Sequence, residues 1–119
     1  MKKYELLPED TIEINGTTLY RIKAIRNFAT VKVGQLGGYI EKEENLSHDG
    51  ECWVYDDAKV FGNANICNNT KVFENAMIYS DSQIQDNINV CDDVCVHGEI
   101  NISGSGYLTS KNHLKIKKK

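Results

Sequence analysis

The fold is decided by residues 54–114, which read VYDDAKVFGNANICNNTKVFENAMIYSDSQIQDNINVCDDVCVHGEINISGSGYLTSKNHL. Within this stretch an aliphatic side chain stands at every sixth position without exception. These positions are Val54, Val60, Ile66, Val72, Ile78, Ile84, Val90, Val96, Ile102, Leu108 and Leu114. A period held this long is the signature of a repeat architecture, in which each repeat packs against its neighbours.

Two further columns of residues accompany the aliphatic one. The column two residues before each aliphatic begins with small side chains, at Cys52, Ala58, Ala64, Thr70, Ala76 and Ser82. Alternation of this kind predicts inward-facing positions on strands of two or three residues. The column three residues after each aliphatic holds Asp57, Asn63, Asn69, Asn75, Asp81, Asn87 and Asp93. Because Asn and Asp tolerate left-handed backbone, we expect the bend of each hexad at this third column.

A short strand and a bend in every hexad predict an all-β fold, a parallel β-helix with triangular coils. Three hexads, or 18 residues, would close one coil. The described pattern gives about three to four short coils between residues 54 and 114. We expect residues 115–119 to form a basic tail.

The region before the repeat divides into a cap and a transition. Residues 1–28 are predicted to form a hairpin cap, because Asn15-Gly16 supplies the two positive-φ positions of a tight primed turn. Residues 29–53 contain several glycines and a strand candidate, Val31-Lys32-Val33. Ile40 and Leu46 are six residues apart, which indicates that the repeat begins here and shifts before Val54.

Two sets of segments carry a family resemblance. VFGNANI at 60–66 and VFENAMI at 72–78 resemble the hexapeptide-repeat superfamily of left-handed β-helices. The longer stretch VKVGQLGGYIEKEENLSHDGECWVYDDAKVFGNA at 31–64 resembles a leader found in the YdcK-like family and in many phage and prophage proteins. The resemblance implies a left-handed β-helix and a phage or prophage origin.

The charge of the chain is unevenly distributed. The net charge is −3, and the last nine residues, KNHLKIKKK, carry five lysines and no acid, so residues 1–110 carry −3 − 5 = −8. An acidic body argues against direct nucleic-acid binding, which needs clustered Lys and Arg. The N-terminal YELLPEDTIEI resembles no signal peptide, and no stretch approaches a membrane span, so we expect a cytoplasmic protein with four reduced cysteines. For a phage-encoded chain this means the host cytoplasm.

Stacking residues 18 apart sorts the outward side chains onto three faces. One face is polar, with Asn65, Gln83, Asn101, Cys67, Gln85 and Ser103. The other two carry aromatic residues, which on exposed surfaces are typical of interfaces. From them we predict a homodimer or homotrimer interface formed by Phe61, Met77, Tyr79, His97 and Trp53.

One corner of the coil collects acidic residues. Asp56-Asp57, Glu74-Asn75 and Asp92-Asp93 stack there and place five carboxylates along one edge. We call these six residues the acidic corner. With the flanking Tyr55 and Phe73, its carboxylates are the predicted binding site for a protein partner with a basic surface. The plainer interpretation is that Asp is simply a good bend residue.

Catalysis and metal binding find little support in the sequence. Hexapeptide-repeat acyltransferases typically carry a His near a loop that interrupts the helix, whereas the hexads here run without insertion. Cys95 and His97 would share a face, but Cys91 belongs to another, which leaves two ligands where zinc needs four. We therefore predict no catalytic residues, no metal site and no cofactor.

These observations favour a non-enzymatic protein-binding β-helix, for example a phage inhibitor of a host defence protein such as a CRISPR-type or other nuclease. Three alternatives stay open: a structural repeat protein that polymerises end to end, an acyltransferase-like protein, and a protein that binds nucleotides between subunits.

Overall fold

The computed structural model describes residues 2–110 and is built almost entirely from β-strands. The N-terminal part contains β1 (Tyr4–Ile14), β2 (Thr17–Ala24), β3 (Leu36–Ile40) and a 3-10 turn, η1 (Glu43–Asn45). Ten short strands follow: β4 (Trp53–Val54), β5 (Lys59–Val60), β6 (Asn65–Ile66), β7 (Lys71–Val72), β8 (Met77–Ile78), β9 (Gln83–Ile84), β10 (Asn87–Val90), β11 (Cys95–Val96), β12 (Asn101–Ile102) and β13 (Ser105–Leu108).

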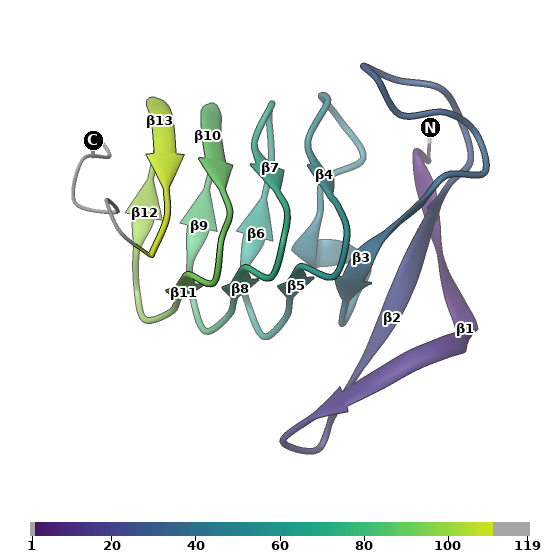
Figure 1. Ribbon diagram of the computed structural model, residues 1–119, viewed down its shortest axis with the longest axis horizontal. Coiled ribbons are helices and arrows are strands. Elements are labelled where there is room, and N and C mark those ends of the chain that lie inside the picture. The colour runs from purple at the N-terminus through teal and green to yellow at the C-terminus, as the bar shows by residue number, and fades with distance from the viewer. Residues whose placement is uncertain (1, 111–119) are drawn as a thin grey trace.

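The ten short strands pair in parallel with one another in three sheets around one axis. The four-stranded sheet contains β4, β7, β10 and β13, and the three-stranded sheet contains β6, β9 and β12. The six-stranded sheet has the order β1-β2-β3-β5-β8-β11. The chain visits the three sheets in turn and forms a left-handed β-helix of about four coils (Figure 1). The predicted fold class is thereby confirmed.

The aliphatic column forms the core, as predicted. Its members from Val54 to Leu108 are at most 5% exposed, and Leu114 lies outside the described residues. Parallel pairing joins residues 18 apart, such as Val60 with Ile78 and Ile78 with Val96. Burying one such side chain contributes about 1.5–3 kcal/mol, so the stacked column is the main source of stability.

The first coil begins before the unbroken repeat. Ile40 of β3 pairs in parallel with Val60, and Leu46 forms a parallel bridge with Ile66. Both partners are 20 residues apart rather than 18, which is the shift that the spacing of Ile40 and Leu46 indicated. The predicted strand at 31–33 is wrong, because Val31 makes only an isolated bridge to Phe28 and the strand of this region is β3.

The N-terminal hairpin caps the first coil. β1 and β2 pair antiparallel, and Asn15 and Gly16 have φ values of 49° and 85°, as the predicted primed turn requires. β2 then pairs with β3, so the hairpin extends the six-stranded sheet beyond the helix (Figure 1). Tyr4, Ile22 and Phe28 join the same hydrophobic core as the coil residues.

The corners turn one residue earlier than predicted. The left-handed backbone falls on the second residue after each aliphatic, with φ between 57° and 101°, and not on the third. These residues are Asp56, Gly62, Asn68, Glu74, Ser80, Asp86, Asp92, Gly98 and Gly104. The columns of Asn and Asp at the third position are instead exposed polar residues that follow the bend.

Candidate functional site

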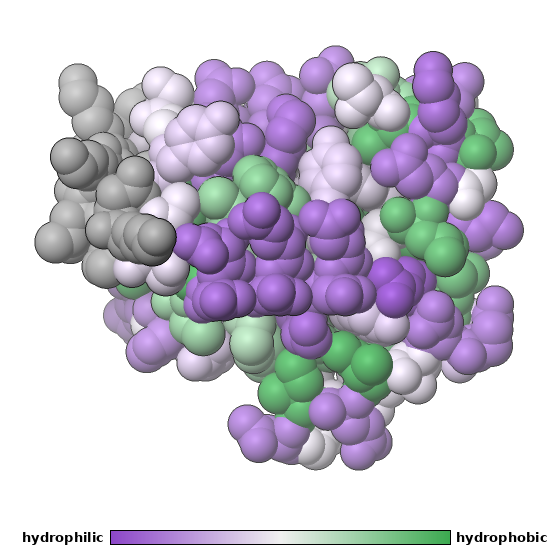
Figure 2. Space-filling view, viewed as in Figure 1, coloured by the Kyte–Doolittle hydropathy of each residue, from purple (hydrophilic) through white to green (hydrophobic). Residues whose placement is uncertain are grey.

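The acidic corner lies where the chain turns from the four-stranded into the six-stranded sheet. Figure 2 shows a continuous hydrophilic band across the front of the molecule in this region. Asp56, Asp57, Glu74, Asp92 and Asp93 all come from the predicted positions, and the structure brings them together along one edge. Asp57 and Asp93 are exposed.

Three of these carboxylates also hold the corner together. The Asp56 carboxylate accepts a hydrogen bond from the backbone N–H of Glu74 at 3.1 Å, and the Glu74 carboxylate accepts one from the N–H of Asp92 at 2.7 Å. The Asp92 carboxylate in turn accepts a hydrogen bond from the Ser110 hydroxyl at 3.0 Å. At a left-handed corner the backbone N–H points away from the hydrogen bonds between the strands. A side-chain oxygen from the preceding coil accepts a hydrogen bond from it instead. The plainer structural interpretation of the corner is therefore correct for Asp56, Glu74 and Asp92.

In the described part of the chain, hydrogen bonds and ion pairs from cationic side chains reach the acidic corner only at its first two residues, Asp56 and Asp57. Arg21 of β2 lies 3.7 Å from the Asp57 carboxylate and donates to the Asp56 carbonyl at 3.1 Å. Within residues 2–110, no ion pair reaches Glu74, Asp92 or Asp93. Glu74, which follows β7, and Asp92, which follows β10, thus accept hydrogen bonds but have no ion-pair partner within that range, and the same holds for the ion pairing of the exposed Asp93.

The flanking aromatic residues lie where the sequence placed them. Tyr55 and Phe73 are half-buried on the four-stranded sheet, where they line a shallow groove with Asp56, Lys71 and Asn89. Burial raises the pKa of the Tyr55 hydroxyl, so this group stays neutral at physiological pH. Tyr107 on the last coil of the same sheet is 56% exposed.

The six-stranded sheet carries the second predicted aromatic column. The rings of Phe61, Tyr79 and His97 stack with centroid separations of 5.0 Å and 5.2 Å. Met77 lies half-buried beside them. The use of this stack as an oligomer interface stays a prediction.

The prediction that Trp53 is an exposed interface residue is wrong. Its side chain is fully buried, and the ring makes edge contacts with Phe28 at 5.2 Å and with Tyr4 at 6.1 Å. Alternation along the strand directs Trp53 outward from the coil, but the N-terminal cap covers this position. Trp53 belongs to the core between the cap and the first coil.

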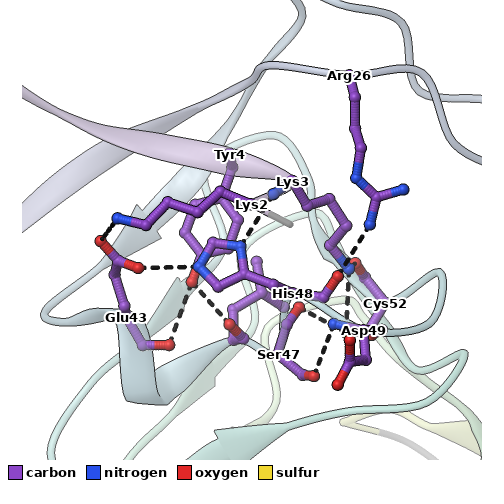
Figure 3. Close-up of polar contacts among 10 residues, drawn as sticks. Lys2, Lys3, Tyr4, Arg26, Glu43, Ser47, His48, Asp49 and Cys52 are labelled. Atoms are coloured by element: carbon purple, nitrogen blue, oxygen red, sulfur yellow. Dashed lines mark hydrogen bonds and ion pairs between the residues drawn. The ribbon is translucent and has the colours of Figure 1, made fainter.

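A buried polar cluster, which sequence reasoning missed, fastens β1 to the first coil (Figure 3). Lys3 is fully buried, and its ammonium group donates to the Cys52 carbonyl at 2.7 Å and lies 4.8 Å from the centre of the Phe28 ring. Tyr4 stacks on His48 at 4.2 Å and donates to the Leu46 carbonyl at 2.6 Å. No local sequence signal distinguishes Lys3 from an ordinary exposed lysine, because the carbonyl groups that its ammonium group bonds lie more than 40 residues away.

His48 holds this cluster in a defined orientation. Its Nδ1 accepts a hydrogen bond from the backbone N–H of Lys3 at 3.0 Å, and its Nε2 lies 2.9 Å from the Glu43 carboxylate. The His48 contact, followed by that of Lys2, holds the pKa of Glu43 below its ordinary value. These contacts fix the cap and leave the ring with both nitrogens engaged, which favours a structural role.

Tyr4 of this cluster should lose part of its stabilising contribution at alkaline pH. Burial raises the pKa of the Tyr4 hydroxyl, so the unfolded chain releases this proton above about pH 10 while the folded chain keeps it. The stability that Tyr4 contributes is complete below its unfolded pKa and falls above it by about 1.4 kcal/mol per pH unit. Replacing Tyr4 by Phe should cost about 1 kcal/mol at pH 7 and remove this slope. Urea unfolding of both proteins between pH 8 and 11 measures the difference, and parallel curves would contradict the assignment.

The remaining chemistry of the described region is sparse. No group of three or more His, Cys, Asp or Glu side chains that could hold a metal ion occurs within residues 2–110. Cys95 and His97 are exposed, Cys91 is buried, and His113 lies outside the described residues. In the same region, no helix is long and apolar enough to cross a membrane.

Comparison with known proteins finds one distant relative. The chain is 39% identical over 74 residues to the uncharacterized acetyltransferase YdcK of Escherichia coli strain K12. This match covers 56% of the chain and 23% of the relative, so the chain spans less than a quarter of that protein's length. No family model matches the sequence. The relative and the stacked coils together fit a hexapeptide-repeat β-helix.

Proposed function

We propose that the chain is a non-enzymatic β-helix that binds a protein partner through the acidic corner. The observation that carries the proposal is the set of carboxylates after β7 and β10, at Glu74, Asp92 and Asp93, which no cation of residues 2–110 pairs. Successive coils lie about 4.8 Å apart, so these like charges repel each other. A basic partner surface would relieve that repulsion.

The hydrogen bonds of the corner do not require negative charge. At the corner between the three-stranded and four-stranded sheets, the side chain of the neutral Asn68 accepts a hydrogen bond from the N–H of Asp86 at 3.1 Å. Asp56 accepts the corresponding hydrogen bond from the N–H of Glu74. At the corner between the six-stranded and three-stranded sheets, the residues with left-handed backbone are Gly62, Ser80 and Gly98. The corner therefore needs an acceptor oxygen, which the amide of Asn68 supplies as well as a carboxylate does, and the charge of Glu74 and Asp92 is additional to that need.

The specific form of this function predicted from the sequence is a phage- or prophage-encoded inhibitor of a host defence nuclease. Surfaces that bind nucleic acid are rich in Lys and Arg, and a row of carboxylates is complementary to them. The origin of the chain and the identity of its partner belong to the proposal alone.

Capture from host-cell lysate tests the acidic corner with its hydrogen bonds intact. Glu74→Gln, Asp92→Asn and Asp93→Asn together remove three charges while leaving an acceptor oxygen at each position. The matched control removes three charges elsewhere on the helix, through Asp81→Asn, Asp86→Asn and Glu99→Gln. We expect wild type and control to retain the same partner and the corner variant to lose at least about tenfold of it.

Circular dichroism should show that both triple variants unfold at nearly the same urea concentration as the wild type. A partner that is retained equally by all three proteins would contradict binding at the acidic corner. If only the control variant loses the partner, the binding site lies at another corner of the helix.

The name of the relative supports a second candidate, an acetyltransferase-like activity. An acetyltransferase requires at least that the protein binds an acetyl donor. Titration of acetyl-CoA into the protein by calorimetry should give no heat of binding under the proposal made here. Saturable binding that His97→Ala abolishes would favour the transferase.

A further inference from the structure

The segment 21–40 is a basic region in an acidic chain. It contains Arg21, Lys23, Arg26 and Lys32 and no Asp or Glu, a net charge of +4. Since residues 1–110 carry −8, the rest of them carry −8 − 4 = −12. The two signs of charge are therefore separated along the sequence, and in the structure β1 brings Glu5, Glu9, Asp10 and Glu13 beside β2, where Asp10 lies 3.3 Å from Arg21.

The basic segment also exposes apolar side chains. Ile25 is 40% exposed, Val33 60% and Leu36 52%; Ile25 and Val33 lie in the loop that links β2 to β3, and Leu36 begins β3. Among residues 2–110, Tyr107 is the other large hydrophobic side chain with comparable exposure, and it lies on the last coil of the four-stranded sheet.

The loop presents these residues on a defined turn. The N–H of Gln35 donates to the Lys32 carbonyl at 2.9 Å, and the Gln35 side chain accepts from the N–H of Lys32 at 3.2 Å. The N–H of Val33 donates to the Asn27 side chain at 2.8 Å, and Gly34 supplies the positive φ of 92° that the turn needs. A preorganised turn loses little conformational entropy on binding.

The basic loop and the last two acidic residues of the corner, Asp92 and Asp93 after β10, lie toward opposite ends of the β-helix. In Figure 1 the loop between β2 and β3 lies at the N-terminal end, and β11 and β13 lie at the other. At the near end, Arg21 of the basic segment already contacts Asp56 and Asp57 of the acidic corner. Glu74, Asp92 and Asp93 are the next steps of the same corner and have no such partner among residues 2–110.

We propose that the partner of the acidic corner is a second copy of this chain, bound head to tail. The loop around Lys32 and Val33 of one copy docks on the C-terminal end of the β-helix of the next, beside the paired strands β10 and β13, where Asp93 supplies charge and Tyr107 apolar surface. This inference rests on the proposed function, because it names the partner of the same corner. Because this contact joins two different surfaces, a two-chain complex still has one free loop and one free acidic corner. Further copies can therefore add to form open chains, or rings if the rotation between copies closes.

Light scattering across a concentration series tests the self-association. At 20 mM salt the weight-average mass should rise steadily above the 13.4 kDa of one chain, and at 0.5 M salt it should fall back toward that value. The wild type remaining at monomer mass up to about 1 mM in low salt would overturn the inference. It would leave the acidic corner as a site for another protein, which the lysate capture tests separately.

Mixing two variants tests the head-to-tail geometry. The loop variant carries Lys32→Glu and Val33→Ser, and the corner variant carries Glu74→Gln, Asp92→Asn and Asp93→Asn. All these side chains are exposed or keep their acceptor oxygens, so both variants should fold. Each should be monomeric alone, and an equimolar mixture should form a two-chain complex and nothing larger, because each variant keeps one intact surface.

A symmetric dimer gives a different outcome in the same experiment. A mass that stops at two chains for the wild type, with both variants still dimeric, would show that another surface mediates association. The stacked face of Phe61, Tyr79 and His97 would then be the surface to test, and the head-to-tail inference would be wrong.

Discussion

Replacing Trp53 by alanine is expected to lower the free energy of unfolding by about 3–5 kcal/mol, the range for truncating a large buried aromatic residue. Trp53 is fully buried between the cap and the first coil, where Phe28 and Tyr4 contact the edge or face of its ring. β4, which carries Trp53, is held by backbone pairing with β7, and Phe28 and Tyr4 belong to the same hydrophobic core, so the cavity cannot collapse completely. Urea unfolding followed by circular dichroism measures the loss.

The exposed Tyr107 provides the control for this prediction. Because its side chain is 56% exposed, Tyr107→Ala should change stability by no more than about 0.5 kcal/mol. Equal losses in the two variants would contradict the burial of Trp53. If Trp53→Ala leaves the stability unchanged but alters the oligomeric state, Trp53 is an interface residue and not a core residue.

Replacing Gly37 by alanine is expected to lower the free energy of unfolding by about 3 kcal/mol. A Cβ atom at this position would lie 2.6 Å from the backbone carbonyl oxygen of Val54 and 2.7 Å from the side chain of Ile22. Neither neighbour can move freely, because one is backbone of the first coil and the other is a buried residue of β2. The substitution would force β3 away from both the cap and the helix.

The adjacent Leu36→Ala variant is the control, since Leu36 is 52% exposed and should tolerate truncation within about 0.5 kcal/mol. Thermal unfolding of the two variants compares them directly. A Gly37→Ala protein as stable as the Leu36→Ala protein would show that β3 does not pack closely against Val54.

The parts of the fold governed by local repetition were predictable from the sequence. An aliphatic at every sixth residue places one inward side chain on each short strand, and pairing of residues such as Val60 and Ile78 follows from three hexads per coil. The primed turn at Asn15-Gly16 was predictable for the same reason, because two adjacent residues determine its backbone.

The position of the corner bend was not predictable from residue preferences. Left-handed backbone falls on Glu74 and Ser80, which are not the residues usually found there, while Asn75 and Asp81 follow them. The hydrogen bond from the preceding coil helps to hold Glu74 in this conformation, since Asp56 accepts from its N–H. That contact joins residues 18 apart, and a local preference does not reveal it.

The cap shows the same limit over longer distances. Trp53 stands at a position that alternation assigns to the surface, and Lys3 has a sequence environment typical of a solvated N-terminus. Both are buried because segments more than 20 residues away fold over them. The composition of the acidic corner was predictable from the repeat, but the hydrogen bonds that give Asp56, Glu74 and Asp92 a structural role were not.

Carboxyl labelling with mass spectrometry tests most directly whether the acidic corner is the binding surface. The modification of each Asp and Glu is compared between the dilute protein and the protein in complex, whether the partner is another copy or a captured host protein. The account predicts that modification of Glu74 and Asp93 falls at least about fivefold in the complex while Asp81 and Glu99 on another corner stay unchanged. Unchanged modification of Glu74 and Asp93, or protection of Asp81 and Glu99 instead, would contradict it.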